Sequence, residues 1–489
     1  MAKQKSLKQK AASGMVWTAL QRYSMMGIQF VSGIILARLL TPYDYGCIGM
    51  LTIFMVLAES FIDGGFGSAL IQKKHPTQED YSTIFFWNLG MAVLLYIVLY
   101  FSAPFIADFY GIPLLCSVLR VQGIILFIYA FNIVQRNQLQ KKLNFKVLSM
   151  VSITTSVISL SVTILMAYHG FGVWSLVTQH IITAFIPALV FWFHIKWRPQ
   201  MVFSWQSFRT LFGFGSYMFL THLVNQFSQQ VRGLFIGKLY SPATMGYYSK
   251  AYSTEKLASY SISQVLSQVT YPLYAEVQDD KEAMKRMLNR LSTSIAYLTF
   301  PLMFILMLVA RPLFILLYSD RWVQSVPYFQ ILCLVGLGVC LQAVNLQTIS
   351  AIGKSRIMFI WALIKQGIGL SLIIGGLFLY GIDGLLWGCV IHSWSCTFIN
   401  MSLVSRYIGY KTSTQIFDIL PVAGVAVLAF FASFYVGKMV DMGLYGGGVV
   451  NLVVFLFIYL GWSFFFKPAP FTYISDLVMV KWRKKHGNR

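Results

Sequence analysis

Long apolar runs recur along the whole chain, and short polar segments separate them. Each run approaches the roughly 20 residues that an α-helix needs to cross a bilayer. The pattern predicts fourteen spans, over residues 14–37, 44–69, 82–103, 113–135, 147–168, 172–195, 208–232, 244–273, 291–311, 325–350, 356–379, 384–406, 416–438 and 444–466. The predicted fold class is an all-α polytopic membrane protein with about 14 transmembrane helices.

An internal repeat divides these spans into two blocks. Residues 29–46, QFVSGIILARLLTPYDYG, align with residues 229–246, QQVRGLFIGKLYSPATMG, at an offset of 200 residues. Each copy contains the end of one span, a turn with a proline, and the start of the next span. The repeat predicts two six-helix lobes of the same orientation plus two C-terminal helices. Parallel repeats of this kind are typical of transporters that work by alternating access.

The predicted domain boundaries follow from this repeat. An N-terminal lobe with spans 1–6 covers residues 14–205, and a C-terminal lobe with spans 7–12 covers residues 206–410. Spans 13 and 14 occupy residues 411–467. A basic segment, 1–13, precedes the first span, and a basic tail, 468–489, follows the last one.

The composition excludes an ordinary soluble enzyme. Of the 489 residues 57% are hydrophobic and 11% are charged, whereas soluble domains carry about 25% charged residues. The net charge of +22 is one-sided: 27 of the 38 Lys and Arg fall on one predicted face, and 5 on the other. The positive-inside rule then places both termini in the cytoplasm. This distribution along a membrane face also removes the need for a nucleic-acid partner.

Metal and catalytic motifs are missing from the sequence. The six cysteines form no CxxC and have no His at ligand spacing, so we expect small buried apolar side chains and no metal site. GxxxxGK[ST], HExxH and GxSxG are absent as well. We therefore expect no catalytic residues and no bound cofactor.

Polar and basic residues inside spans are functional candidates, because charge at bilayer depth is unfavourable. Guanidinium groups bind phosphate oxygens, and amides form hydrogen bonds with sugar hydroxyls. The hypothetical substrate-binding residues are Arg22, Gln29, Arg120, His222, Asn225, Gln226, Gln229, Arg232 and Lys250. For Arg22, Arg232 and Lys250 the alternative is that their charged ends reach the lipid headgroups.

A second group of buried charges could couple transport to an ion gradient or act in gating. Its members are Glu59, Asp63, Glu255 and Lys365. Glu59 and Asp63 are four residues apart and share one helix face. They could hold a proton or a sodium ion, or be neutralised by a buried cation in a structural ion pair. Asp63 also opens the sequence DGGFG, where we expect the helix to break.

Several stretches resemble the polysaccharide transporter branch of the multidrug/oligosaccharidyl-lipid/polysaccharide exporter superfamily. They are ARLLTPYDYG (37–46), FIDGGFGSALIQKK (61–74), IADFYGIP (106–113), LQKKLNF (139–145), HGFGVWSLVTQ (169–179), MGYYSKAY (245–252) and YPLYAEVQDDKE (271–282). The resemblance implies a flippase of the O-antigen or colanic-acid type in the bacterial inner membrane. Its substrate would be an undecaprenyl-pyrophosphate-linked oligosaccharide repeat unit, for surface polysaccharide synthesis.

Two alternatives stay open at this point. One is a multidrug or lipid II type exporter of the same fold, which for cationic drugs would favour an acidic cavity. The other is a membrane-embedded polysaccharide polymerase or ligase, although no large external loop is predicted. The expected partners are the lipid-linked oligosaccharide and anionic lipids at the basic tail, with polysaccharide polymerase machinery as a further candidate. Na⁺ or H⁺ are the candidate coupling ions.

Overall fold

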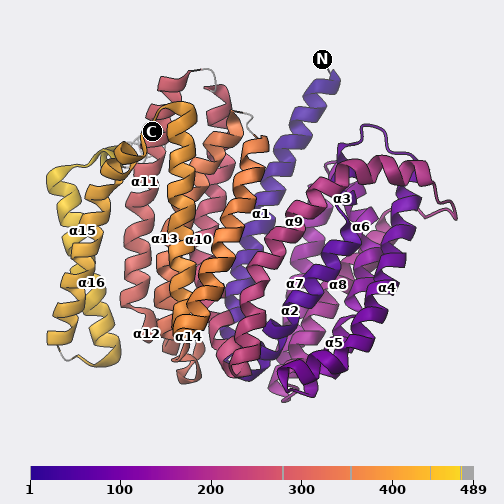
Figure 1. The fold of residues 1–489 in the computed structure, drawn as a ribbon, viewed down its shortest axis with the longest axis horizontal. Coiled ribbons are helices and arrows are strands. Elements are labelled where there is room, and N and C mark those ends of the chain that lie inside the picture. Colours follow the sequence, from indigo (N-terminus) through magenta and orange to yellow (C-terminus); the bar gives the residue numbers. More distant parts are fainter. Residues whose placement is uncertain (1, 278–279, 353–354, 441, 474, 476–489) are drawn as a thin grey trace, which may run out of the picture. The chain divides into compact units, whose positions relative to one another are not determined.

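The computed structural model describes residues 2–277, 280–352, 355–440, 442–473 and 475. Throughout these residues the regular structure is helical, and no strand occurs (Figure 1). The chain forms two compact units, Met1–Ser249 and Lys250–Arg489. The all-helical membrane fold predicted from the sequence is confirmed. Most of the basic tail lies outside the described residues.

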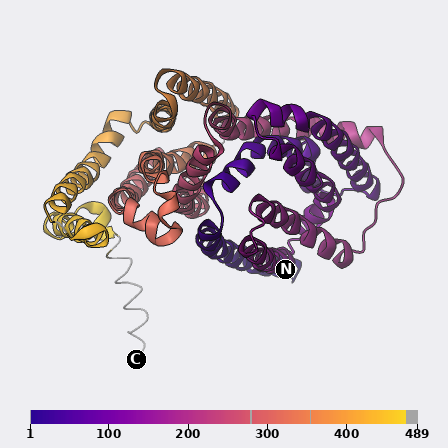
Figure 2. The same cartoon turned by 90° about the horizontal axis from the view of Figure 1, so that it is seen from below.

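In its described residues the first unit contains nine helices and the first turns of a tenth. They are α1 (Ala2–Leu39), α2 (Pro42–Asp63), α3 (Phe66–Gln72), α4 (Gln78–Tyr110), α5 (Leu114–Gln122), α6 (Ile125–Lys141), α7 (Phe145–Tyr168), α8 (Val173–His194), α9 (Trp205–Leu239) and the start of α10 (Pro242–Glu276). Figure 2 shows these helices nearly end-on, in indigo to purple. Because α9 packs on α2, α3 and α4, its contacts lie in the first unit. The lobe boundary at residues 205 and 206 stays a prediction from the repeat.

The second unit contains the rest of α10 and the remaining helices. They are α11 (Lys281–Leu308), α12 (Ala310–Tyr318), the short 3₁₀ helix η1 (Asp320–Trp322), α13 (Ser325–Ala351), α14 (Ser355–Ile408), α15 (Thr412–Met439) and α16 (Gly443–Phe466). α14 is two helices in sequence, because Tyr380 and Gly381 leave helical geometry, and Gly381 has a φ of 65°. This break separates the eleventh and twelfth predicted spans.

Fourteen spanning segments result for the described residues when α2 and α3, and α5 and α6, each count as one broken span, α14 counts as two spans, and the nine-residue α12 is left out. Ten stretches are long and apolar enough to meet a transmembrane criterion by composition, one of which includes both halves of α14. The helices α1, α9 and α10 are not among these ten. Their polar residues, such as Gln21 and Arg22 in α1, reduce their hydropathy, as expected for helices that face other protein surfaces.

The repeat reappears as the same local geometry. α2 begins at Pro42 and α10 begins at Pro242, and each follows a two-residue break after a long helix. Thr41 accepts a hydrogen bond from the amide of Asp44, and Ser241 accepts one from the amide of Thr244. A hydroxyl N-cap followed by proline at the first helical position is a strong start signal. The same chemistry therefore begins the second helix of each repeat.

The two copies of this turn also touch each other inside the first unit. A Cβ on Gly46 would overlap the carbonyl oxygen of Pro242, and a Cβ on Gly246 would overlap that of Pro42. Because both glycines have helical backbone angles, glycine is required at these positions for the close approach of the two chain segments and not for an unusual φ. The reciprocal contact pairs equivalent positions of the repeat.

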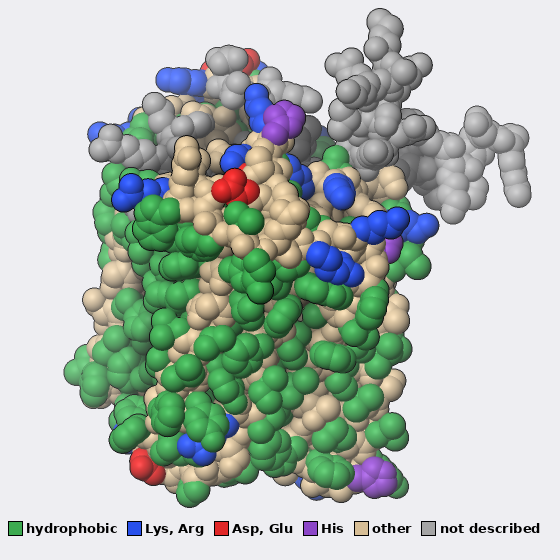
Figure 3. All heavy atoms as spheres, turned by 90° about the vertical axis from the view of Figure 1, so that its right-hand side faces the viewer, with side chains coloured by type: hydrophobic (Ala, Val, Ile, Leu, Met, Phe, Trp, Pro, Cys, Tyr) green, Lys and Arg blue, Asp and Glu red, His purple; other side chains and the backbone are tan. Residues whose placement is uncertain are grey.

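The outer surface of the first unit is apolar in its middle part. Figure 3 shows hydrophobic side chains over this part and most Lys and Arg near one end. Phe101 and Phe105 of α4 are 68% and 75% exposed. An exposed apolar surface of this kind is suited to contact with acyl chains.

Candidate functional site

The first unit encloses a polar cavity of about 710 Å³ between six helices. Its polar lining comes from Thr18, Gln21, Glu59, Ser60, Asp63, Tyr129, Asn132, Arg136, Asn137, Gln140, Ser152, Thr183, His222 and Gln226. Apolar surface is added by Val56, Ile133, Phe145, Leu148, Ala184, Pro187 and Phe191. So many hydrogen-bonding groups around one space inside a membrane helix bundle are expected only where a polar ligand or water is present.

One helix, α6, presents a face of amides to the cavity. Asn132, Arg136 and Gln140 follow one another at intervals of four residues, and Asn137 lies beside them. Such spacing places side chains on one side of a helix. Asn137 is 7% exposed, and its Nδ2 makes no hydrogen bond to a described residue. The Oδ1 of Asn132 also makes no hydrogen bond to a described residue. Both atoms are buried without a described partner, so a rotation of each amide toward the cavity would let it form a hydrogen bond with a ligand or water.

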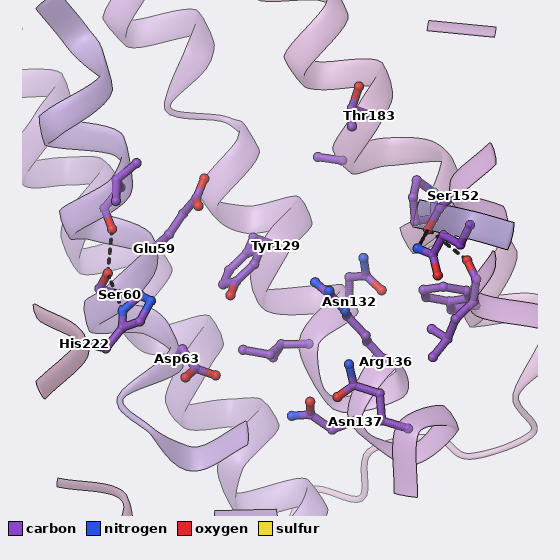
Figure 4. A pocket seen from close by; sticks show the side chains of 18 of the residues that line it. Glu59, Ser60, Asp63, Tyr129, Asn132, Arg136, Asn137, Ser152, Thr183 and His222 are labelled. Carbon is purple, nitrogen blue, oxygen red and sulfur yellow. Dashed lines mark hydrogen bonds between the residues drawn. The ribbon is translucent and has the colours of Figure 1, made fainter. Parts of the chain in front are cut away.

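The opposite wall carries the two carboxylates of α2. In Figure 4, Glu59, Ser60 and Asp63 lie together with His222 of α9, across the cavity from Asn132, Arg136 and Asn137. The hydroxyl of Ser60 lies 3.3 Å from Nδ1 of His222. Glu59 makes no hydrogen bond or ion pair with a described residue, so its carboxylate is available to whatever fills the cavity.

Asp63 has a local structural role at the break between α2 and α3. Its carboxylate accepts hydrogen bonds from the backbone amides of Gly65 and Gly67. Gly64 and Gly65 have φ values of 52° and 75°, a region that glycine enters at little cost. Asp63, the last residue of α2, therefore holds the backbone at the start of α3, where Gly65 is the N-cap. The helix break predicted at DGGFG is confirmed.

The helices α1 and α7 close another side of the cavity through one glutamine. Gln21 donates from Nε2 to the hydroxyl of Ser152 at 3.0 Å, and its Oε1 accepts from Ser149 at 3.1 Å. These bonds fix the Gln21 amide on the wall. The next residue, Arg22, is half-buried and is not part of the lining.

The charges in the cavity differ from the basic lining that the sequence suggested. Four titratable residues other than tyrosine line it, namely Glu59, Asp63, Arg136 and His222. No ion pair joins either carboxylate to a described cation, so a structural salt bridge is not seen. The substrate-binding role predicted for Arg22, Arg120, Arg232 and Lys250 stays a prediction.

Four of the predicted site residues meet in this cavity, namely Glu59, Asp63, His222 and Gln226. Further along α9, Asn225 and Arg232 are half-buried, and Gln229 is exposed. Gln29 of α1 is also exposed. These residues belong to the first unit but do not line the cavity.

Arg120 lies on α5, away from the lining residues. Its guanidinium carbon is 4.2 Å from the centroid of the Tyr100 ring, and its Nε donates to the Tyr100 carbonyl at 3.3 Å. Through these two contacts the Arg120 side chain packs against Tyr100 of α4.

Three predicted residues belong to the second unit. Lys250 is 4% exposed, with its Nζ 4.0 Å from the Tyr318 ring centroid. Lys365 donates to Oδ1 of Asn400 at 3.0 Å. Glu255 is 4% exposed and lies against Gly336.

Sequence reasoning missed the α6 face, and with it the guanidinium of the cavity. Arg136 was assigned to the basic cytoplasmic face. The missed signal was NIVQRNQLQ (132–140), in which polar residues recur at steps of three and four beside the end of a span. No cluster of three or more His, Cys, Asp or Glu suited to a metal occurs among the described residues.

A multi-pass helical bundle with a polar chamber inside one unit is the architecture of a membrane transporter. The sequence profile of the family described as "Polysaccharide biosynthesis protein" matches residues 35–327. The match covers more than half of the chain, so the chain belongs to this family.

Three curated relatives are bacterial proteins named for the biosynthesis of teichuronic acid, lipopolysaccharide or succinoglycan. The chain is 26% identical over 358 residues to the teichuronic acid biosynthesis protein TuaB of Bacillus subtilis, covering 73% of this chain and 74% of the relative. It is 26% identical over 385 residues to the succinoglycan biosynthesis transport protein ExoT of Rhizobium meliloti, covering 77% and 76%. It is 22% identical over 334 residues to the lipopolysaccharide biosynthesis protein WzxC of Escherichia coli, covering 68% of each chain.

Solved structures share the fold. The lipid II flippase MurJ, in an inward closed conformation, superposes with a TM-score of 0.74 and 16% identity, covering 93% of this chain and 99% of that one. An inward-facing multidrug resistance MATE family transporter of the MOP superfamily gives a TM-score of 0.62 and 15% identity, covering 81% and 98%.

Proposed function

We propose that this protein is a flippase for an oligosaccharide repeat unit linked to undecaprenyl pyrophosphate. It carries the unit from the cytoplasmic to the outer leaflet by alternating access, and surface polysaccharide synthesis uses the product. The observation that carries the proposal is the polar cavity of about 710 Å³ within a membrane helix bundle of the polysaccharide biosynthesis family. Relatives named for transport and for lipopolysaccharide biosynthesis support it.

The position of the cavity along the helices fits loading from the cytoplasmic side. Asp63 lies at the end of α2, and Arg136 and Gln140 lie in the last two turns of α6. The charge asymmetry of the sequence assigns these helix ends to the cytoplasmic face, in a bacterial inner membrane with both termini inside. A substrate made in the cytoplasm would therefore meet this end of the cavity first.

The protein acts as a transporter and not as an enzyme in this proposal. Its cavity residues offer hydrogen bonds and charges for binding. The Ser60 hydroxyl lies 3.3 Å from Nδ1 of His222, but it donates its proton to the Val56 carbonyl at 2.7 Å, so His222 is not placed to deprotonate it. Chain lengthening or glycan transfer by the purified protein would favour the polymerase or ligase alternative instead.

The free energy for directed transport would come from a proton or sodium gradient, with Glu59 as the coupling residue. Glu59 faces the cavity without a partner among the described residues, whereas the Asp63 carboxylate accepts hydrogen bonds from the amides of Gly65 and Gly67. Transport that persists after collapse of both gradients would contradict this part of the proposal.

A second candidate is export of cationic drugs, and the two carboxylates of the cavity favour it. A cation-exporting protein needs acidic groups in its binding cavity, which Glu59 and Asp63 could supply. Deletion of the gene would then lower the minimal inhibitory concentration of cationic dyes, with surface polysaccharide unchanged.

Gene deletion combined with lipid analysis separates these functions. A flippase mutant should accumulate the lipid-linked repeat unit on the cytoplasmic leaflet and lose the surface polysaccharide, and a plasmid copy should restore both. Normal surface polysaccharide with no accumulated precursor would overturn the proposal.

A further inference from the structure

We propose that the cavity of the first unit holds the sugar part of the substrate, and that the pyrophosphate stays outside it. Glu59 and Asn137 would form hydrogen bonds with sugar hydroxyls from opposite walls. This inference rests on the flippase function proposed above. It assigns the hydroxyl-rich portion of the ligand to one cavity.

The volume suits a short oligosaccharide. The cavity of about 710 Å³ falls within the range of roughly 300–1,000 Å³ that is usual for small-molecule sites. Since one water takes up about 30 Å³ in the liquid, the space far exceeds what a single cation requires. An ion-binding role alone leaves most of the cavity unexplained.

The available hydrogen-bonding groups match sugar hydroxyls, which both donate and accept. Glu59 offers acceptor oxygens without a described partner. From the other wall, Nδ2 of Asn137 is a donor and Oδ1 of Asn132 is an acceptor, and neither atom has a partner among the described residues. Buried polar atoms are normally satisfied, so these atoms indicate a bound ligand or water.

The aromatic side chains of the cavity also suit a sugar ligand. Tyr129 projects between the two walls in Figure 4, and Phe191 lines another part of the cavity. A pyranose ring presents C–H groups on its faces and hydroxyls at its edge. The aromatic rings can therefore pack against the C–H faces of a sugar, and the neighbouring amides can form hydrogen bonds with its hydroxyls.

The charges of the cavity disfavour a pyrophosphate. Glu59 and Asp63 face Arg136 as the one guanidinium of the lining, and His222 is hydrogen-bonded to Ser60. A pyrophosphate would bring at least two further negative charges next to these carboxylates. Like charges in a low-dielectric site repel strongly. An uncharged sugar meets no such repulsion, and a carboxylate improves its binding through charge-assisted hydrogen bonds.

Equilibrium binding to the full-length protein in lipid nanodiscs tests this assignment. One probe is the repeat-unit oligosaccharide released by mild acid from the lipid-linked precursor of the same bacterium. The other probe is undecaprenyl pyrophosphate without sugar. The variants are Glu59→Gln and Asn137→Leu. Glu79→Gln is the matched control, because Glu79 is an exposed carboxylate outside the cavity.

The oligosaccharide should bind the wild type and Glu79→Gln equally, and each cavity variant about tenfold more weakly. Sugar-free lipid should bind all four proteins with the same affinity. Equal oligosaccharide affinities in all four would overturn the inference. Tighter binding of the sugar-free lipid to Glu59→Gln would also overturn it, because that result places the phosphates in the cavity.

Two measurements keep the test decisive. If a variant does not fold, the oligosaccharide must still raise the thermal unfolding temperature of the wild type, and no shift would contradict the inference. Precursor accumulation in the deletion strain reports on the flippase function separately. Accumulation without Glu59-dependent sugar binding would reject this site and leave the flippase function standing.

Discussion

Lys73 and Asp80 form an ion pair across the turn between α3 and α4, with 2.6 Å between Nζ and Oδ2. The Asp80 side chain has no exposed surface, whereas Lys73 is 34% exposed. Asp80 also accepts from the amide of Thr77 at 2.8 Å and closes a capping box there. One carboxylate thus fixes both the turn between α3 and α4 and the start of α4.

Replacing this carboxylate should destabilise the protein. Asp80→Asn removes the charge that pairs with Lys73 and weakens the cap, and we expect a loss of about 1–3 kcal/mol in the free energy of unfolding. The loss can be measured by thermal unfolding in detergent. Glu79→Gln, one residue earlier and exposed, should change stability by less than about 0.5 kcal/mol. Equal effects of the two substitutions would contradict the role of the buried carboxylate.

The reciprocal glycine contact predicts a steric effect. Gly46→Ala places a methyl group against the Pro242 carbonyl and should destabilise the first unit by about 1–3 kcal/mol. Gly90→Ala is the control, because a Cβ on Gly90 of α4 meets no atom within 4 Å. Alanine also has the better helix propensity, so the control should be neutral or slightly stabilising. Comparable melting temperatures for the two variants would show that the contact can relax.

The role of Asp63 can be separated into hydrogen bonding and charge. The Oδ1 of asparagine can accept from the Gly65 or Gly67 amide as a carboxylate oxygen does, so Asp63→Asn should retain stability, whereas Asp63→Ala should lose about 1 kcal/mol. If hydrogen bonding is the whole role, Asp63→Asn should also export polysaccharide at the wild-type level. A stable Asp63→Asn protein with no export would instead assign the negative charge to transport.

In the second unit, Tyr410 lies between the ends of α14 and α15. Its hydroxyl donates to Asp418 and accepts from Asn289, and the side chain is 2% exposed. Burial, together with the Asp418 carboxylate, raises the pKa of Tyr410 above its ordinary value near 10. Above that pH the unfolded chain releases the phenolic proton while the folded protein keeps it.

Tyr410 should therefore stabilise the protein fully below about pH 10 and progressively less as the pH rises. Tyr410→Phe should cost about 1–2 kcal/mol at pH 7, and the difference from wild type should shrink above pH 10. Chemical denaturation of the variant and the wild type, at pH 7 and at a pH above 10, measures this change in the difference between their free energies of unfolding. A difference that is independent of pH would argue against a buried neutral phenol.

Much of the fold follows from the sequence because its determinants are local. Apolar run length defines the spans, and a hydroxyl N-cap before Pro42 and Pro242 marks the repeated turn. The glycines after Asp63 mark the helix break. These signals act over a few residues and need no knowledge of neighbours.

The cavity was harder to predict because it depends on which helices meet. Arg22 and Gln29 of α1 are candidates from the sequence, but their spacing does not show which helix they face. In the structure the neighbouring Gln21 reaches the cavity, and its hydrogen bonds to α7 hold it there. The α6 amides were overlooked because they stand beside a basic loop.

The contact between Gly46 and Pro242, with its counterpart at Gly246 and Pro42, also bears on the origin of the chain. Each copy of the repeat meets the other through the same residues, which is the property of an isologous dimer interface. A single-copy ancestor could have formed this contact between two identical molecules. Gene duplication and fusion would then have turned a homodimer into one polypeptide, after which the two halves were free to diverge. Independently expressed halves that never associate would count against this history.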